Sequence, residues 1–278
     1  MKTQKLRKAG CVTMTNTRTD PAPHATATFV AVSGLVFTVS VAVTVYFCQS
    51  MAGGMDMPGG WTMSMMWMRM PGQSWVAAVA MFLLMWLTMM VAMMLPSALP
   101  MLWKFRRSLT ENGNVGAPMM LVASGYFFVW LVCGVVVYAV GVPFALAAMR
   151  WEWLSRFVPV LSGAALVLAG VFQFTSWKMS GLGRCRNSLC GTGGENCRML
   201  DVGWHYGLEQ GASCCICCVA PMVALLVLGS MNLLVMVLIA VVIAMEKLMP
   251  NPKLFVRIFG VVAVVAGIAM TSRALSFY

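Results

Sequence analysis

Residues 81–101, MFLLMWLTMMVAMMLPSALPM, decide the fold class, because the whole stretch contains no charged side chain. A helix needs about 20 apolar residues to cross the hydrocarbon core of a bilayer. The chain is 60% hydrophobic and 10% charged, against roughly 25% charged residues in soluble domains. Its long apolar runs are 29–48, 75–103, 119–140, 157–177, 213–245 and 254–270. We therefore predict an all-α polytopic transmembrane helix bundle of about six spans, formed by one domain over 29–278.

One of these runs is too long for a simple span. As a single helix, residues 213–245 would measure about 50 Å. A break at GSMN, residues 229–232, would give seven spans, but its two arms of about 24 Å each are short for a bilayer. We favour six spans, and seven stays open.

The net charge of +11 follows the predicted topology. Most of the basic residues fall before the first span and after the second and fourth: Lys2, Lys5, Arg7, Lys8 and Arg18, then Lys104, Arg106 and Arg107, then Lys178, Arg184, Arg186 and Arg198. Because basic loops stay in the cytoplasm, we predict a cytoplasmic polar tail over 1–28, an external loop over 49–74 and a cytoplasmic loop over 178–213. The pattern indicates a bacterial cytoplasmic-membrane protein in contact with the lipid bilayer, and no nucleic-acid partner.

The external loop contains MAGGMDMPGGWTMSMMWMRMPG, residues 51–72, in which eight residues are methionine. A thioether is a soft ligand that forms no disulfide, so it suits Cu(I) in an oxidising compartment. The candidate ligands in this loop are Met55, Met57, Met63, Met65, Met66, Met68 and Met70. The alternative is that these methionines fill gaps at the lipid interface.

The opening stretch continues this pattern along a helix. Methionines recur every four residues from Met81 to Met93, which places them along one helical face. Either this face is a ladder of Cu(I) sites, with Met85, Met89, Met93 and Met94 as ligands, or it packs against other helices. Pro96 and Pro100 are expected to break or kink the inner end of this helix.

The cytoplasmic side has a second sulfur-rich stretch, SCCICCVAPM at 213–222. Thiols stay reduced in the cytoplasm, and thiolates prefer Cu(I) or zinc. The candidate ligands are Cys185, Cys214, Cys215, Cys217 and Cys218, with His205 as a further ligand or a solvated side chain. Cys11, Cys48 and Cys133 are expected to be isolated residues, with apolar packing as the default for buried ones. Glu246 is expected to pair with the adjacent Lys247 at the membrane interface.

These segments together resemble an uncharacterised bacterial family of predicted metal-binding integral membrane proteins. The resemblance rests on the Met-rich loop, VAMMLPSALP, CCICC, GSMNLL and EKL, and spans roughly residues 51–260. It points to Met85, Trp86, Met89, Met93, Met94, Pro96, Cys214, Cys217, Cys218, Met222, Asn232 and Glu246. It also implies a cysteine where this chain has Gly181; either Cys190 and Cys197 replace this ligand, or the site is altered or lost. Members of that family have no assigned activity.

We predict a copper-binding membrane protein that handles Cu(I) through methionines outside and cysteines inside, for transfer, uptake or delivery to a metalloenzyme. Zinc is the alternative metal at the cysteines. No constellation of acid–base or nucleophilic residues indicates an enzyme. The alternatives are a non-catalytic subunit or assembly factor of a membrane metalloenzyme complex, and a thiol oxidoreductase. Partners beyond the bilayer would be metalloenzyme subunits or a copper chaperone.

Overall fold

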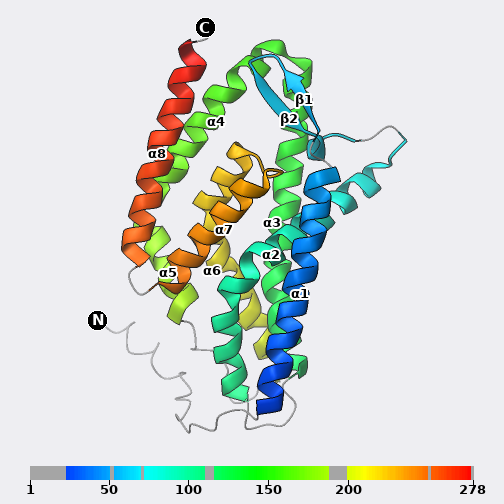
Figure 1. Ribbon diagram of the computed structural model, residues 1–278, viewed down its shortest axis with the longest axis vertical. Helices are drawn as coiled ribbons and strands as arrows, with labels where there is room; N and C mark the ends of the chain where they lie inside the picture. The colour runs from blue at the N-terminus through cyan, green and yellow to red at the C-terminus, as the bar shows by residue number, and fades with distance from the viewer. Residues whose placement is uncertain are drawn as a thin grey trace, which may run out of the picture.

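Helices form most of the computed structural model, which describes residues 23–50, 53–69, 72–109, 116–187, 199–249 and 252–276. These residues contain α1 Pro23–Ser50, α2 Trp75–Leu109, α3 Gly116–Arg150, α4 Glu152–Phe172, α5 Ser176–Asn187, α6 Met199–Leu228, α7 Leu233–Leu248 and α8 Pro252–Ser276 (Figure 1). Six of them, all except α5 and α7, are long and apolar enough to cross a membrane. The predicted all-α polytopic bundle with about six spans is confirmed.

The outer surface of the bundle is rich in apolar side chains. Val76 on α2, Met120 on α3 and Leu168 on α4 are each at least two-thirds exposed, and many other valine and leucine side chains of the long helices also face outward. Soluble monomers rarely expose apolar patches of this extent. The surface therefore suits a lipid environment.

The long apolar run at 213–245 is two helices, so the favoured single-helix prediction is wrong. α6 ends at Leu228, and Gly229 has a φ of 106°, a conformation that glycine adopts without steric cost. The Asn232 side chain then accepts hydrogen bonds from the backbone N–H groups of Leu234 (3.0 Å) and Val235 (3.4 Å), which caps α7. α7 runs back beside α6 as a helical hairpin (Figure 1). α6 is nevertheless one of the six helices long and apolar enough to cross a membrane, because its apolar stretch begins at Gly203 and continues to Leu228.

The two prolines of α2 do not end this helix, which continues through Pro96 and Pro100 to Leu109. α2 therefore runs unbroken from the methionine-rich segment past Ser97 to Lys104. It is the element that connects the two sulfur-rich regions.

Glycines allow α6 to lie directly against α3. A Cβ atom on Gly125 would lie 2.8 Å from the Trp204 carbonyl oxygen, and one on Gly211 would lie 2.9 Å from the Tyr126 carbonyl oxygen. Small residues at such a seam let helix backbones approach closely in membrane proteins. The seam fixes the position of the helix that carries the cysteine cluster.

The Met-rich segment has regular structure. It forms an antiparallel hairpin, β1 Gly54–Met57 and β2 Trp61–Ser64, followed by a short 3-10 helix, Met65–Trp67. Gly59 and Gly60, at the turn, have φ values of 107° and 71°. Figure 1 shows the hairpin at the end of the bundle where α3 and α4 meet.

One serine holds this hairpin on the helices. The Ser155 hydroxyl of α4 donates to the Pro58 carbonyl (2.8 Å), and the Trp61 indole N–H donates to the Ser155 carbonyl (3.0 Å). A Cβ atom on Gly59 would lie 3.2 Å from the Arg156 Cα, so the turn lies directly on the start of α4. These contacts give the methionines of the segment defined positions.

Candidate metal centre

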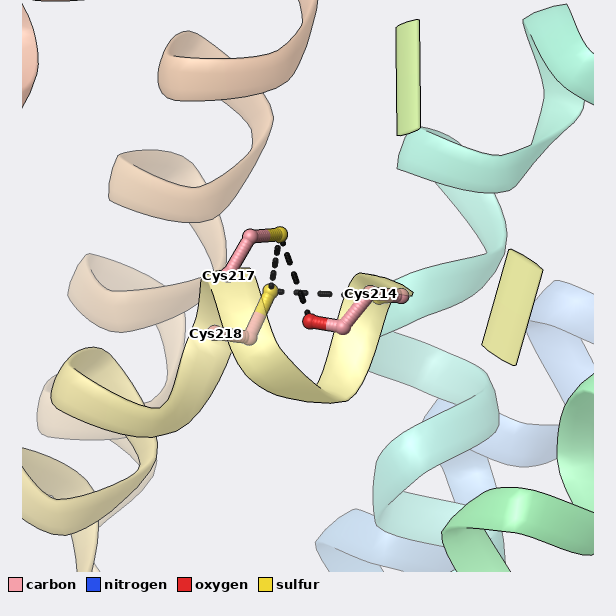
Figure 2. A group of neighbouring side chains, drawn as sticks. All are labelled: Cys214, Cys217 and Cys218. Atoms are coloured by element: carbon pink, nitrogen blue, oxygen red, sulfur yellow. Dashed lines mark hydrogen bonds between the residues drawn. The ribbon is translucent and has the colours of Figure 1, made fainter. Parts of the chain in front are cut away.

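Three cysteines of α6 bring their sulfurs together, and we call them the cysteine triad: Cys214, Cys217 and Cys218 (Figure 2). Their spacing of i, i+3 and i+4 places them on one side of the helix. All three are buried, and their Sγ atoms lie within 4.8 Å of one another, at 3.9 Å for Cys214 to Cys218 and 3.6 Å for Cys217 to Cys218. Thiolates about 2.3 Å from a shared ion lie roughly 3.7–4.0 Å apart. The triad can therefore hold one metal ion with little movement.

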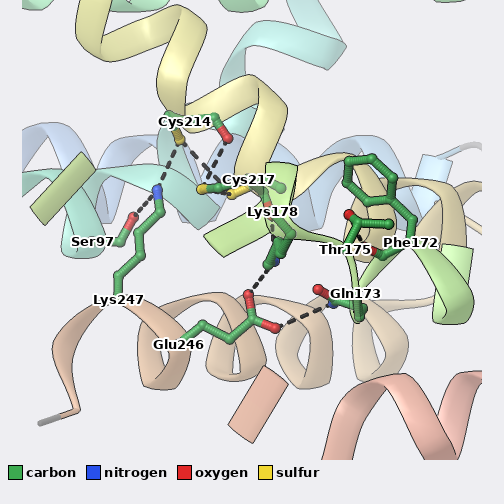
Figure 3. Close-up of polar contacts among 10 residues, drawn as sticks. Ser97, Phe172, Gln173, Thr175, Lys178, Cys214, Cys217, Glu246 and Lys247 are labelled. Atoms are coloured by element: carbon green, nitrogen blue, oxygen red, sulfur yellow. Dashed lines mark hydrogen bonds and ion pairs between the residues drawn. The ribbon is translucent and has the colours of Figure 1, made fainter. Parts of the chain in front are cut away.

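Two donors from other helices reach the Cys214 sulfur. The Lys247 ammonium of α7 lies 2.8 Å from this Sγ and 3.3 Å from the Ser97 hydroxyl of α2 (Figure 3). The Tyr126 hydroxyl of α3 donates to the same sulfur over 3.0 Å. Both groups stabilise negative charge, which a metal–thiolate centre carries in a buried environment.

A buried ion pair lies on the other side of the triad. Lys178 of α5 forms a 2.6 Å ion pair with Glu246 of α7 and donates to the Cys217 carbonyl oxygen (Figure 3). Gln173 donates to the second Glu246 oxygen over 3.2 Å. Removing one partner of a buried pair typically costs about 3–5 kcal/mol, so this network holds the helical turn around Cys217 firmly in place.

This pair corrects two expectations from the sequence. Glu246 pairs with Lys178, which lies 68 positions earlier, and the adjacent Lys247 contacts Cys214 instead. Lys178 is completely buried, so it is not a solvated loop residue, and its charge does not indicate the membrane topology. A lysine and a glutamate next to apolar runs were the sequence signal for these roles, since ionisable groups in such positions usually have a partner and a function.

Cys215 belongs to a different thiol group from the triad. Its sulfur lies 3.0 Å from the sulfur of Cys133 on α3, at the α3–α6 seam, and the triad does not include it. The expectation that Cys133 is isolated is therefore wrong. The four cysteines at 214–218 therefore divide into the triad and one member whose sulfur contacts Cys133 of α3.

The remaining cysteine-side candidates do not add a ligand among the described residues. Cys11, Cys190, Cys197 and the Cys185 side chain lie outside the described part of the chain. His205 is exposed on α6 and is not part of the triad. Gly181 is informative, because a Cβ atom there would lie 3.7 Å from the Cys217 Cβ and 3.4 Å from Ile216. A side chain at position 181 would thus be a direct neighbour of the triad.

Five methionines line a second, smaller site. A cavity of about 70 Å³, which we call the methionine chamber, lies between the 3-10 helix and the start of α2. Its lining residues are Met65, Met66, Met68, Gln73, Ala78, Met81, Phe82, Met85 and Tyr138. Met66 also accepts a 3.1 Å hydrogen bond from the Ser230 hydroxyl at the α6–α7 turn. The chamber brings together thioethers from the two segments of the sequence that were predicted to bind Cu(I).

Other methionines of the loop lie elsewhere. Met57 and Met63 are buried against Ala145 and Ala148 of α3 and Val158 of α4, where they fill the space under the hairpin. Met55 is 42% exposed on β1, and Met70 lies outside the described residues. Of the described loop methionines, Met65, Met66 and Met68 line the chamber, Met57 and Met63 pack under the hairpin, and Met55 does neither.

The predicted helical methionines connect the chamber to the triad. Met89, Met93 and Met94 are almost completely buried in the same core as Met85 and the triad. From Met85 to Ser97, α2 advances about 18 Å, and Ser97 contacts Lys247 beside Cys214. The two sites thus lie at different depths of one sulfur-rich core.

A larger cavity of about 230 Å³ reaches the triad from the far end of α2. It is lined by Ser97, Ala98, Pro100, Met101, Lys104, Tyr126, Tyr206, Gln210, Cys214, Lys247 and Leu248. Cys214 is the one triad residue in this lining, so its sulfur is the one that the cavity approaches.

Comparison with known families gives one match. The model of the family described as PpoB2, copper chaperone, matches residues 83–270, about two thirds of the chain. The matched region contains the triad, Lys178, Glu246 and Lys247, and it begins after the hairpin. No curated protein and no solved structure matches the chain.

Proposed function

The chain belongs to the PpoB2 family of copper chaperones, and from this premise we propose that it holds Cu(I) on the thiolates of Cys214, Cys217 and Cys218 for delivery to a copper-requiring protein. The observation that carries the proposal is the convergence of three buried sulfurs, 3.6 and 3.9 Å apart, on one turn of α6. Thiolates are soft ligands that favour Cu(I).

Charge balance supports a low coordination number at the triad. Cu(I) with two thiolates has a net charge of −1, and the Lys247 ammonium next to Cys214 makes the assembly neutral. A neutral assembly costs less to bury than a charged one. The third sulfur is then available to bond to the ion while another bond breaks, which is what a carrier that must release its metal requires.

We further propose that the protein is embedded in the bacterial cytoplasmic membrane with the N-terminus inside and the hairpin outside. The methionine chamber would collect Cu(I) by thioether coordination at the outer end, and the buried methionines of α2 would lead it to the triad. Cu(I) binds a thioether without displacing a proton, but it binds a thiolate more strongly. The arrangement of the chamber first and the triad second therefore favours movement of Cu(I) toward the triad. The apolar surface of the long helices supports the membrane location.

Metal analysis of the purified protein tests the copper assignment. After growth in copper-supplemented medium, the wild type should contain copper, and a variant with Cys214, Cys217 and Cys218 changed to serine should lose most of it. Cys215→Ser is the matched control, because it alters the same helix and the same CCICC stretch but removes a sulfur outside the triad. Copper loss of equal size in the control, or zinc in place of copper in the wild type, would contradict the proposal.

The proposed topology has a separate test. Because α7 returns as a short helix, α8 ends near the hairpin end of the bundle, where Figure 1 places the C-terminus. A topology reporter fused to the C-terminus should therefore read out as external, and one fused to the N-terminus as cytoplasmic. Readout of both on the same side would contradict this topology.

A further inference from the structure

The cavity of about 230 Å³ next to the triad has a cationic lining. Lys104 lies exposed at one wall and Lys247 at another, and no aspartate or glutamate is among the lining residues. The remaining polar groups are the hydroxyls of Ser97, Tyr126 and Tyr206 and the amide of Gln210. Such a lining attracts anions and repels a bare metal cation.

The cavity also contains the one reactive sulfur that it needs for exchange. Cys214 belongs both to the lining and to the triad, and Lys247 lies 2.8 Å from its Sγ. All three triad cysteines are buried, but Cys217 and Cys218 lie outside the lining. A copper complex that occupies the cavity therefore meets Cys214 first.

We propose that this cavity binds Cu(I) as the complex of a small anionic thiol, a molecule with a thiolate ligand and at least one carboxylate, and exchanges the ion at Cys214. The inference rests on the proposed function of the triad. It adds the chemical class of the molecule that brings copper to the triad or removes it.

The exchange step involves no change of oxidation state. In loading, the Cys214 sulfur displaces one carrier thiolate from Cu(I), and the sulfur of Cys217 or Cys218 then displaces a second, so each new Cu(I)–sulfur bond replaces one that breaks. The proton of each incoming cysteine thiol is transferred to the carrier thiolate that leaves, so the numbers of protons and electrons balance. The copper stays Cu(I), and unloading is the same step in reverse.

The size and the charge of the cavity favour a small carrier. Typical pockets for drug-sized ligands measure about 300–1,000 Å³, so 230 Å³ suits a small molecule or part of a short peptide. The lysines would hold the carboxylate while the carrier sulfur lies toward Cys214. A recipient protein that inserts its own cysteine is the competing source of the incoming thiolate, and the experiment below separates the two.

The test compares the rates at which apoprotein in detergent takes up Cu(I) from two donors. One is the Cu(I) complex of glutathione, a peptide thiol with two carboxylates, and the other is the Cu(I)–acetonitrile complex, which is cationic. Loading is followed by the copper content of the protein at successive times, measured after rapid removal of the free donor on a desalting column. The variant is Lys104→Glu at the rim of the cavity. Lys253→Glu, an exposed lysine at the start of α8 outside the lining, is the matched control.

We expect Lys104→Glu to slow loading from the glutathione complex about tenfold at low salt, because an anion is no longer attracted to the rim. Loading from the acetonitrile complex should be unchanged or faster, and the final copper content should equal that of the wild type. Lys253→Glu should load like the wild type from both donors.

Four results would overturn the inference. Equal slowing from both donors would show a structural effect of the substitution, and no slowing from either, or an equal effect of Lys253→Glu, would show that the rim does not select an anionic carrier. If loading is slowed from neither donor and the triad still binds copper, a protein partner becomes the source of the thiolate and the proposed function stands. A protein that takes no copper from either donor overturns the proposed function together with this inference.

Discussion

The cysteine triad and the methionine chamber both offer soft sulfur ligands, but their sulfurs are held in different ways. The triad lies on a single turn of α6, with Lys247 and Lys178 on either side and a glycine seam behind it. The chamber is assembled from the 3-10 helix Met65–Trp67 and the start of α2. Thiolates in a rigid site suit tight binding, whereas thioethers contributed by two separate segments suit initial capture.

The two regions also differ in their relation to the copper chaperone family. The family match at residues 83–270 includes every residue of the triad and its charged neighbours. Of the chamber methionines, the match includes Met85 alone, since Met65, Met66, Met68 and Met81 precede it. Most of the chamber methionines therefore lie outside the matched region, whereas the whole triad lies inside it.

The largest expected difference between the regions is their response to pH. Copper binding to a thiolate displaces a proton, so the affinity of a site with two thiolates falls about 100-fold for each pH unit of acidification. A thioether has no proton to lose, so the affinity of the chamber should stay constant over the same range. Competition with a Cu(I) chelator of known pH dependence measures both values.

The triad-to-serine variant isolates the chamber in this experiment, because its remaining copper is bound by methionine. If the copper affinity of that variant falls with acid as steeply as that of the wild type, thiols outside the triad bind the metal and the comparison fails. If the wild type shows no pH dependence, thiolates are not its main ligands.

The second expected effect is the conversion of the triad to a site with four thiolates. Gly181→Cys places a sulfur next to Cys217, where a Cβ atom would make ordinary van der Waals contacts of 3.4 and 3.7 Å. Four sulfurs suit tetrahedral zinc, so zinc affinity should rise about tenfold or more, while Cu(I), which accepts fewer ligands, should gain little. Metal competition with a zinc indicator measures the change.

Gly181→Ser is the control for this substitution, because it adds similar volume without a soft ligand. Equal zinc affinity in the two variants would mean that the side chain at position 181 does not reach the metal, and that α5 and α6 are arranged differently around the triad.

Sequence reasoning predicted the helix bundle well, because apolar runs of about 20 residues allow few other structures. It misjudged residues 213–245, although Gly229 and Asn232 are a visible helix stop and N-cap, because span length was given more weight than these local signals. Helical spacing alone does not separate Cys214, Cys217 and Cys218 from Cys215, because Cys215 also lies about one turn from Cys218; the contact with Cys133 on α3 is what places the Cys215 sulfur outside the triad.

Other features of the site depend on tertiary packing, so the sequence does not show which residues pair. The Lys178–Glu246 pair joins α5 to α7, and the Cys133–Cys215 contact joins α3 to α6. The chamber requires Ser155 to hold the hairpin in place before Met65 and Met68 can meet Met85. Composition alone therefore grouped chamber methionines with packing methionines such as Met63.

A smaller effect should separate these two kinds of methionine. Changing Met65, Met66, Met68, Met81 and Met85 to leucine removes the chamber sulfurs, whereas changing Met57 and Met63 to leucine removes sulfurs that pack under the hairpin. In the triad-to-serine background, silver, a Cu(I) mimic, should bind several-fold more weakly to the first variant and unchanged to the second. Because leucine and methionine have similar volumes, each substitution should cost less than about 1.5 kcal/mol of stability.

Isothermal titration with Ag(I), together with thermal unfolding, checks this difference. Equal loss of silver binding in both variants would show that the hairpin methionines act as one group, and no loss in either would show that the chamber is packing. The second result would leave the triad as the one soft-metal site supported among the described residues.

The smallest expected effect concerns a single hydrogen bond in the chamber. The Ser230 hydroxyl donates a hydrogen bond to the Met66 sulfur over 3.1 Å. This bond engages a lone pair of the sulfur that would otherwise bind a metal ion. Ser230→Ala frees that sulfur, so Ag(I) affinity in the triad-to-serine background should rise by about two- to fivefold, equivalent to a hydrogen bond of roughly 0.5–1 kcal/mol. The copper content of the wild-type triad should stay the same, since Ser230 lies at the opposite end of the α6–α7 hairpin from Cys214. A fall in silver affinity would mean that the hydroxyl holds Met66 in its binding position, and no change would indicate that Met66 is not a ligand. Ser230→Thr, which keeps the hydroxyl, should bind silver like the parent protein and shows whether the effect belongs to the hydrogen bond.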